Sequence, residues 1–112
     1  MPRLKVQTLT EQMFYTLLCL KNECCGIDIL DKVPEMTHGR VKVGSGTLYT
    51  LLEQFLEEEM IRETKTEGRK RSYILTKKGK ERLSQEYERI YAQILDYRSI
   101  FGEEDALSLI HI

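Results

Sequence analysis

The spacing of apolar residues predicts two helices in the first third of the chain. Between Leu9 and Leu20 the apolar positions are dense enough for a helix that is buried on most sides. Thr8-Leu9-Thr10-Glu11 has the capping-box pattern, in which a Thr hydroxyl binds free backbone amides and a Glu three residues later reaches back. A turn from Lys21 to Cys25 precedes a second, short helix that begins after Gly26. We expect this helix to stop at Pro34, because proline breaks the helical hydrogen-bond pattern.

An amphipathic helix is predicted from Thr47 to Glu58. Its apolar residues lie at positions 48, 51, 52, 55 and 56, which form one stripe on a helical surface, and Ser45 is the expected N-cap. The preceding segment, Met36–Gly44, contains two glycines and several β-branched residues. We therefore expect a loop there, with a short strand at Val41–Val43.

A β-hairpin and a long charged helix complete the pattern. Met60–Thr66 and Lys70–Thr76 are strand-like runs, and Glu67-Gly68-Arg69 between them contains the glycine of a tight turn. A long helix is expected after Thr76.

This long helix has the clearest periodicity in the chain. Its apolar residues step by four and three along nearly three heptads, and Tyr91 and Leu95 widen the stripe on one side. Such a stripe needs a cover, which is either the chain's own core or a second copy of the chain. Because a chain this short can hide only part of the stripe by folding back, we expect a homodimer. The predicted dimer interface comprises Leu83, Tyr87, Ile90, Tyr91, Ile94, Tyr97 and Phe101.

The order of helix, helix, loop, helix, hairpin and long helix is that of a winged helix-turn-helix domain. We therefore predict a fold that is mainly α with a small β-hairpin. Residues 1–78 would form the winged-helix DNA-binding domain, and residues 79–112 a long C-terminal dimerisation helix and tail. A length of 112 residues allows one compact domain with such an extension, but not two independent cores.

The net charge of −1 conceals a basic segment. Residues 62–82 carry nine basic and three acidic side chains, whereas residues 83–112 carry two basic and six acidic ones. Because phosphate binding depends on a local basic face, the basic segment is compatible with nucleic acid. A plain solvated surface would have the same composition.

The ends and the cysteines of the sequence indicate a cytoplasmic protein. The first residues lack the apolar run of a signal peptide, and no stretch is long and apolar enough to span a membrane. Cys19, Cys24 and Cys25 are an odd number in one short segment, which does not suit a structural disulfide or a zinc site. We expect reduced, largely buried thiols, with a thiol-reactive sensor as the alternative.

No pattern of catalytic residues is present in the sequence. His38 and His111 are the two histidines, and neither has a Ser, Cys or paired carboxylate at a spacing that suggests a site. A Gly-rich phosphate loop and a metal-ligand cluster are also missing from the sequence. We therefore predict a protein that is not an enzyme and that has no cofactor and no metal.

Three motifs in the chain resemble the PadR-like family of transcriptional regulators. Gly46-Thr47-Leu48-Tyr49-Thr50-Leu51-Leu52, which follows Val43-Gly44-Ser45, is similar to the family's Ser-x-Gly-Thr-Leu-Tyr-Pro-Leu-Leu. Glu57-Glu58-Glu59-Met60-Ile61 resembles Glu-Glu-x-Gly-Leu-Ile, and residues 68–79 resemble Gly-Arg-x-Arg-x-Tyr-x-Leu-Thr-x-x-Gly. The resemblance covers about residues 9–85, in the family's order and spacing.

The chain departs from this pattern at three places. Thr50 stands for the usual Pro, Met60 for the usual Gly, and Cys25–Ile29 for a His-Gly-Tyr-Glu-Ile type of segment. The resemblance implies that the protein is a homodimer held by the C-terminal helix. It also implies that the protein is a repressor, and that repression is often relieved by a small aromatic or lipophilic effector.

The predicted DNA-binding surface combines the start of the third helix with the hairpin. Free backbone amides and the positive end of the helix dipole favour a phosphate at the helix start, while hydroxyls there can reach base edges. Hairpin cations would bind neighbouring phosphates or the minor groove. The predicted residues are Lys42, Ser45, Gly46, Thr47, Tyr49, Thr50, Lys65, Arg69, Lys70 and Arg71.

Three other questions are open from the sequence. Tyr49 either points outward or packs on the neighbouring helix. Phe14, Tyr87 and Tyr91 either line an effector pocket between the first and last helices or belong to the dimer core. The domain itself binds either duplex DNA or, as a protein-interaction module, another protein. In the latter case, an exposed apolar patch would replace the basic hairpin.

Overall fold

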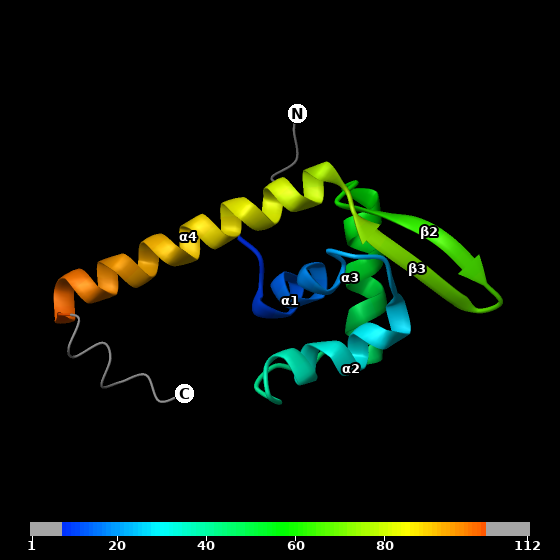
Figure 1. Cartoon of the computed structure of the whole chain (residues 1–112), viewed down its shortest axis with the longest axis horizontal. Helices are drawn as coiled ribbons and strands as arrows, with labels where there is room; N and C mark the ends of the chain where they lie inside the picture. The colour runs from blue at the N-terminus through cyan, green and yellow to red at the C-terminus, as the bar shows by residue number, and fades with distance from the viewer. Residues whose placement is uncertain (1–7, 103–112) are drawn as a thin grey trace.

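The computed structural model describes residues 8–102. Three helices form a compact body, a β-hairpin projects from one side of it, and a long helix extends from the other side (Figure 1). This arrangement confirms the predicted winged helix-turn-helix fold. The elements are α1 (Glu11–Cys19), β1 (Cys24–Cys25), α2 (Gly26–Met36), α3 (Ser45–Glu57), β2 (Ile61–Glu67), β3 (Lys70–Leu75) and α4 (Lys77–Phe101).

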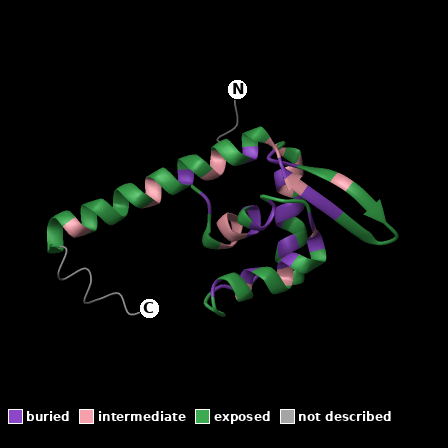
Figure 2. Ribbon diagram, viewed as in Figure 1, coloured by how far each residue is buried: buried purple, intermediate pink, exposed green. Residues whose placement is uncertain are grey.

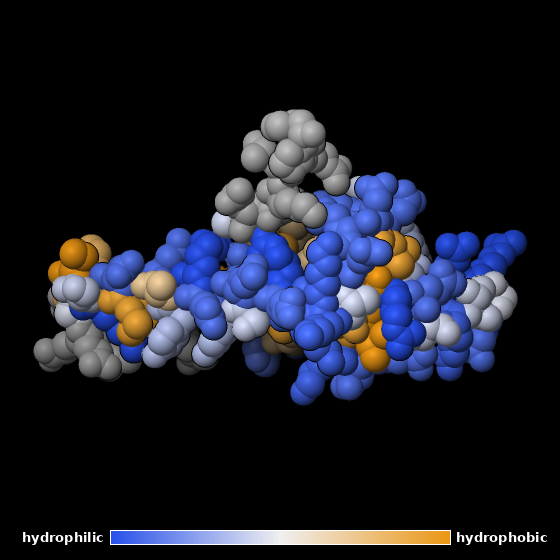
Figure 3. Space-filling view, turned by 90° about the horizontal axis from the view of Figure 1, so that it is seen from above, coloured by the Kyte–Doolittle hydropathy of each residue, from blue (hydrophilic) through white to orange (hydrophobic). Residues whose placement is uncertain are grey.

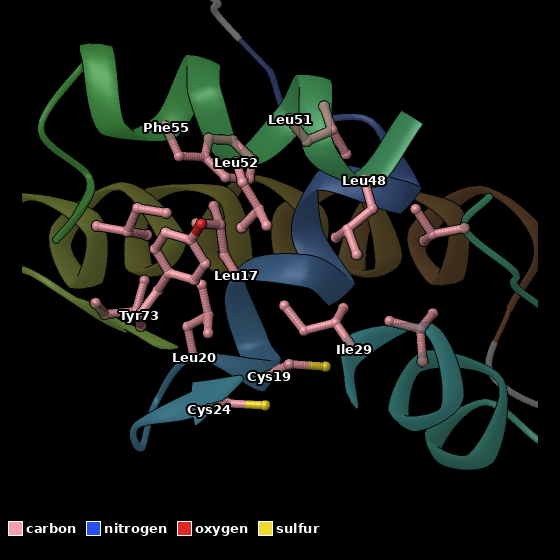
Figure 4. Packing of buried hydrophobic residues seen from close by; sticks show 14 of the residues in the cluster. Leu17, Cys19, Leu20, Cys24, Ile29, Leu48, Leu51, Leu52, Phe55 and Tyr73 are labelled. Atoms are coloured by element: carbon pink, nitrogen blue, oxygen red, sulfur yellow. The ribbon is translucent and has the colours of Figure 1, made fainter. Parts of the chain in front are cut away.

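The core lies between α3 and the first two helices. The apolar stripe of α3 points toward Leu17, Leu20 and Ile29 (Figure 4). Phe55 and Leu48 of that stripe are almost completely buried, as expected from their helical spacing. Because this face of α3 is fixed against the core, the opposite face is left on the surface.

The sheet has three strands, whereas the sequence predicted two. The two-residue strand β1 pairs antiparallel with β3, so that Cys24 lies opposite Tyr73 and Cys25 opposite Ser72. The segment containing β1 was expected to be a turn, because two residues are too few to show an alternating pattern. The pairing joins the hairpin to the helical body.

Two helix boundaries differ from the predictions. Thr10, not Thr8, is the N-cap of α1, and its hydroxyl accepts a hydrogen bond from the Met13 amide at 3.1 Å. α2 continues through Pro34 to Met36. Pro34 lies near the end of the helix, where its missing amide costs the helix one hydrogen bond. The helix continues past it because the Thr37 amide still donates to the Val33 carbonyl.

The segment before α3 is not a strand, which corrects the prediction for Val41–Val43. Both valines are buried, but the Val41 amide donates to the hydroxyl of Thr37 at 3.0 Å and does not pair with a strand. The N-cap of α3 is Gly44, with extended backbone, and not Ser45. Ser45 is the first helical residue and its side chain is exposed.

A left-handed residue ends α3. Glu59 has a φ of 61°, and the Met60 amide donates back to the Phe55 carbonyl. The position whose backbone suits glycine is therefore Glu59. The family motif had placed the usual glycine at Met60, but the Met60 side chain is buried. In the wing, Gly68 has a φ of 63° in the turn between β2 and β3, as its place in the hairpin predicted.

α4 is anchored where it passes the body. The Thr76 hydroxyl accepts a hydrogen bond from the Gly79 amide at 3.1 Å and donates to the Glu59 carbonyl at 2.6 Å. A Cβ atom on Gly79 would lie 2.0 Å from the carbonyl oxygen of Met60, so only glycine allows this approach. The Thr-x-x-Gly sequence is explained by this junction.

Beyond the junction, most of α4 is exposed (Figure 2). The end of the helix carries apolar side chains on its surface, seen as orange patches far from the wing (Figure 3). The exposed large apolar residues of α4 are Tyr87, Tyr91, Ile94, Leu95, Tyr97, Ile100 and Phe101. None of the helices in residues 8–102 has the length and apolarity needed to cross a membrane.

Candidate nucleic-acid interface

The start of α3 presents small and hydroxyl-bearing residues to solvent. Ser45, Gly46, Thr47 and Thr50 are exposed, and the side chain of Tyr49 is 49% exposed. Tyr49 therefore points outward and does not pack on the neighbouring helix. The Thr50 hydroxyl donates to the Gly46 carbonyl at 3.0 Å, within the helix.

The backbone at this end of α3 is accessible. No side chain caps the helix, and a Cβ added to Gly46 would meet no atom within 4 Å. Amides of a first helical turn have no partner within the helix, and the helix dipole places partial positive charge beside them. This end of α3 can therefore accept a phosphate group closely.

The loop before α3 is tied to α1, which fixes the position of the helix. Arg40 donates to Glu11 and to the Tyr15 hydroxyl, both at 3.0 Å, and Gln12 donates to the Lys42 carbonyl at 3.0 Å. These contacts are exposed, so each adds little to stability. They connect the segment that leads into α3 to the body at several points, and the Lys42 side chain remains exposed.

The wing carries the positive charge that α3 lacks. The charged residues within α3 are Glu53 and Glu57, both exposed. Lys65, on β2, and Arg69, Lys70 and Arg71, at the turn and on β3, are all exposed. The positive charge of this surface therefore lies on the wing and, as partial charge, at the amide end of α3.

A hollow of about 730 Å³ joins the two predicted halves of the surface. Tyr49 of α3 and the wing cations Arg69, Lys70 and Arg71 all line it. The remaining predicted residues (Lys42, Ser45, Gly46, Thr47, Thr50 and Lys65) are exposed but do not line it. We call this hollow, with its ten lining residues, the wing groove; the lining is Cys25, Gly26, Ile27, Tyr49, Thr66, Gly68, Arg69, Lys70, Arg71 and Tyr73.

Six of the ten residues that line the groove were not predicted from the sequence as site residues. Cys25, Gly26 and Ile27 reach the groove because β1 pairs with β3, which no local pattern indicated. Tyr73 follows Arg71 by two residues, so strand alternation could have placed both on one face. Burial raises the pKa of Tyr73, which keeps its hydroxyl protonated and able to donate a hydrogen bond.

The cysteines behave as unreactive thiols where they are buried. Burial raises the pKa of Cys19 to about 11, and burial also raises the pKa of Cys24. Both thiols are protonated at neutral pH, and all three cysteines are free. These findings agree with reduced thiols; Cys25 is half-buried on the wall of the wing groove.

The predicted interface residues of α4 fall into two groups. Leu83 packs partly buried against the core of its own chain, and Ile90 is half-buried. The other five are exposed and include two stacked ring pairs: Tyr87 with Tyr91 at 6.1 Å, and Tyr97 with Phe101 at 4.7 Å between centroids. The exposed apolar residues of α4 from Tyr87 to Phe101 are called the distal face below.

The predicted effector residues are divided between two surfaces. Phe14 is half-buried on α1, with its ring 5.5 Å from that of Tyr15 in an edge-to-face arrangement. Tyr87 and Tyr91 stack on exposed α4, and the wing groove contains none of the three. His38, weighed as a catalytic residue, is exposed in a loop with a φ of 55°. His111 and the tail lie outside the described residues.

Within residues 8–102, no group of three or more His, Cys, Asp or Glu side chains could hold a metal ion. The site consists of hydroxyls, backbone amides, aromatic rings and cations. These groups bind phosphates and base edges.

Comparisons with solved structures reproduce the fold. The structure of H. salinarum RosR has a TM-score of 0.66, at 18% identity, over 90% of this chain and 97% of that chain. A PadR-like transcription factor from B. fragilis has a TM-score of 0.63, at 25% identity, over 79% of this chain and 86% of that chain. PcaV of Streptomyces coelicolor, solved in complex with its natural ligand, has a TM-score of 0.69, at 11% identity, over 92% and 70% of the two chains.

A structure with bound DNA is also similar. Bacillus subtilis PadR in complex with operator DNA has a TM-score of 0.57, at 26% identity, over 67% of this chain. The match spans 45% of the B. subtilis protein. A comparison with curated protein sequences finds no match.

The family comparison covers most of the winged-helix domain. The transcriptional regulator PadR-like family matches residues 16–85, which include α3, the wing and the start of α4. This agrees with the prediction that the protein is not an enzyme. The chain belongs to the PadR-like family of transcriptional regulators.

Proposed function

We propose that this protein is a sequence-specific regulator that binds duplex DNA as a homodimer through the wing groove. The observation that carries the proposal is that Arg69, Lys70 and Arg71 of the wing line the same groove as Tyr49 of α3. The start of α3 would enter the major groove, and the wing cations would bind the phosphates beside it. Similarity to B. subtilis PadR, solved with operator DNA, supports this.

The distal face supports the homodimer. Isolated exposed apolar side chains are common on soluble proteins, but seven on one helix form a patch of the kind that marks an interface. A second copy offers the same face, so a two-fold axis would bury both together. The dimer would place its two recognition helices about 34 Å apart, one turn of B-DNA.

Repression and its relief by a small molecule form the finer part of the proposal. A dimer bound over a promoter would exclude other proteins from the same DNA. A small aromatic or lipophilic effector would favour an arrangement of the dimer that no longer fits the operator. Phe14, Tyr87 and Tyr91 are the candidates for its site, and PcaV, a protein of similar fold, has been solved with its natural ligand.

A protein-binding module is the alternative, and the groove disfavours it. Such a module was expected to replace the basic wing with an exposed apolar patch. The wing instead carries five exposed cations, although Ile27, which is 50% exposed, adds an apolar contact in the wing groove.

The test is binding of the gene's own upstream DNA, measured by fluorescence anisotropy. Arg69→Ala with Arg71→Ala should weaken binding about 10- to 100-fold and reduce the slope of log affinity against log salt by about two. Lys78→Ala with Lys80→Ala removes the same charge from the exposed start of α4 and serves as the control. Equal effects of the two pairs would contradict the groove assignment, and a lack of duplex binding by the wild type would contradict DNA binding itself.

A further inference from the structure

Glu86 is a buried carboxylate on α4. Its side chain is 1% exposed, although it lies on a helix that is otherwise mostly solvent-exposed. Arg89 donates a hydrogen bond to it, and Arg82 Nη1 lies 3.7 Å from its Oε1. Its third partner is the backbone of Leu9, in the segment that leads into α1.

The carboxylate is charged in the folded protein. The hydrogen bond from Arg89 is the largest cause that lowers the pKa of Glu86, and the backbone of Leu9 and the charge of Arg82 act in the same direction. Taking a carboxylate out of water is costly, and an apolar residue often serves stability as well or better. The cluster is therefore better explained by the geometry that it imposes than by the stability that it adds.

That geometry concerns the direction of α4. Gly79, Leu83 and Glu86 are spaced by four and three residues, so they share one face of the helix. Gly79 meets the Met60 carbonyl, Leu83 packs against the core, and Glu86 meets Leu9. Glu86 is the last buried residue of the described part of α4, and the helix beyond it leaves the body (Figure 1).

The length of helix beyond Glu86 amplifies small changes at this point. Residues from Tyr87 to Phe101 extend the helix by about 22 Å, at 1.5 Å per residue. A rotation of about 10° at Glu86 would therefore displace the end of α4 by about 4 Å. Arg82 and Arg89 lie on α4 itself, so they orient and neutralise the carboxylate. Within this cluster, the contact of Glu86 with the Leu9 backbone joins the helix to the body, and a directional hydrogen bond restricts rotation more than an apolar contact does.

We infer that Glu86, held by Arg82 and Arg89, is a positioning residue that fixes the angle between α4 and the winged-helix body. In a dimer joined by the distal face, this angle sets the separation of the two wing grooves and hence the half-site spacing that is recognised. This consequence for DNA rests on the proposed function, whereas the angle within one chain does not.

The first experiment measures the angle without DNA. Nitroxide labels are introduced through noncanonical amino acids at exposed Glu35 of α2 and Ser99 of α4, and labelled chains are diluted with unlabelled ones. Electron–electron resonance should give one narrow distance distribution for the wild type and for Glu88→Gln, which changes an exposed acid on the same helix. Glu86→Gln should broaden or shift the distribution.

A second variant separates positioning from folding. Glu86→Met with Arg89→Met replaces the main ion pair with apolar side chains and is expected to fold with a thermal midpoint near that of the wild type. The inference predicts a broadened or shifted distance for this variant too. A narrow, unshifted distribution in the folded double variant would overturn it.

The second experiment uses palindromic operators whose half-site spacing is altered by one or two base pairs. The wild type and Glu88→Gln should prefer one spacing by about tenfold or more, and the Glu86 variants should discriminate much less. Failure of the wild type to bind any operator would count against the proposed function, while the distance measurement would still decide the angle. Full discrimination by a variant with a broadened angle would show that the angle does not set the spacing.

Discussion

The wing groove and the distal face of α4 are both exposed, but their chemistry is opposite. The groove brings hydroxyls, aromatic rings and three neighbouring cations to one hollow, whereas the distal face consists of seven large apolar side chains on the last turns of one helix. A phosphate backbone would be attracted by the cations of the groove but not by the distal half of α4, where Glu88 and Asp96 balance Arg89 and Arg98. A second copy of the chain could bury its own apolar face against the distal face. Bound at the groove instead, it would have to neutralise the cations there.

The junction between these surfaces is built from backbone contacts. Gly79 approaches the Met60 carbonyl, and Thr76 connects the start of α4 to the end of α3. The two surfaces are therefore connected through one close-packed junction. Variants at the groove, the distal face and the junction should have different consequences.

The largest effect is expected at the distal face. Ile94→Glu would place an unpaired carboxylate in the proposed dimer interface, where burying a charge costs several kcal/mol, so dimer dissociation should become at least about 100-fold more favourable. Gln93→Glu adds the same charge at a neighbouring exposed position outside the heptad stripe. Sedimentation velocity should find monomers of the first variant and dimers of the second. Equal dimerisation by both would remove the distal face from the interface.

A smaller effect is expected at the junction between α4 and the body, where substitution should lower the free energy of unfolding. Gly79→Ala must push α4 away from the Met60 carbonyl, because the new Cβ would lie 2.0 Å from that oxygen. The free energy of unfolding should fall by about 1–3 kcal/mol, as measured by thermal or urea denaturation. Gly46→Ala, also within a helix but facing open space, should be neutral or slightly stabilising. If both variants unfold alike, the close approach at Gly79 is not a constraint.

At the wing groove, Tyr49→Ala should lower the affinity for the operator sequence without changing the charge of the groove. Loss of an uncharged side chain at a base edge should weaken operator binding about tenfold and leave the salt dependence unchanged. Tyr49→Phe tests the hydroxyl alone. Anisotropy titrations at several salt concentrations measure both quantities. A reduced salt slope in Tyr49→Ala would mean that Tyr49 acts by positioning the wing cations.

The smallest effect is expected at the end of α3. Glu59 adopts a left-handed backbone at φ 61°, which costs a residue with a Cβ about 1 kcal/mol. Glu59→Gly should therefore raise the free energy of unfolding by up to about 1 kcal/mol. Met60→Gly, in contrast, empties a buried position and should lower it by about 2 kcal/mol or more. The opposite ranking would show that the glycine position is Met60.

The features that were predictable from the sequence have strong local patterns. The apolar stripe of α3 and the Gly-containing turn of the wing follow from residue spacing, and both lie where the sequence placed them. The family motifs placed Tyr49 and Arg69–Arg71 on one surface, and the structure brings them to the same groove.

The features that were missed depend on contacts distant in sequence. β1 exists because β3 offers it an edge, and the helical path through Pro34 depends on the hydrogen bonds that follow it. The cap of α1 is Thr10 and not Thr8; both threonines offer a hydroxyl two residues apart, so the local sequence does not distinguish them. Burial of Glu86 had no signal in the sequence, where it is one acid among many on a charged helix.

The most direct measurement for the central claim is a hydroxyl-radical footprint of the protein on the gene's upstream DNA. A homodimer that binds through two wing grooves should protect two patches of backbone on one face of the duplex, centred about 34 Å apart. In Ile94→Glu, protection should weaken at both patches together. A single protected patch in the wild type, or a footprint unchanged by Ile94→Glu, would contradict the account of a paired, groove-bound regulator.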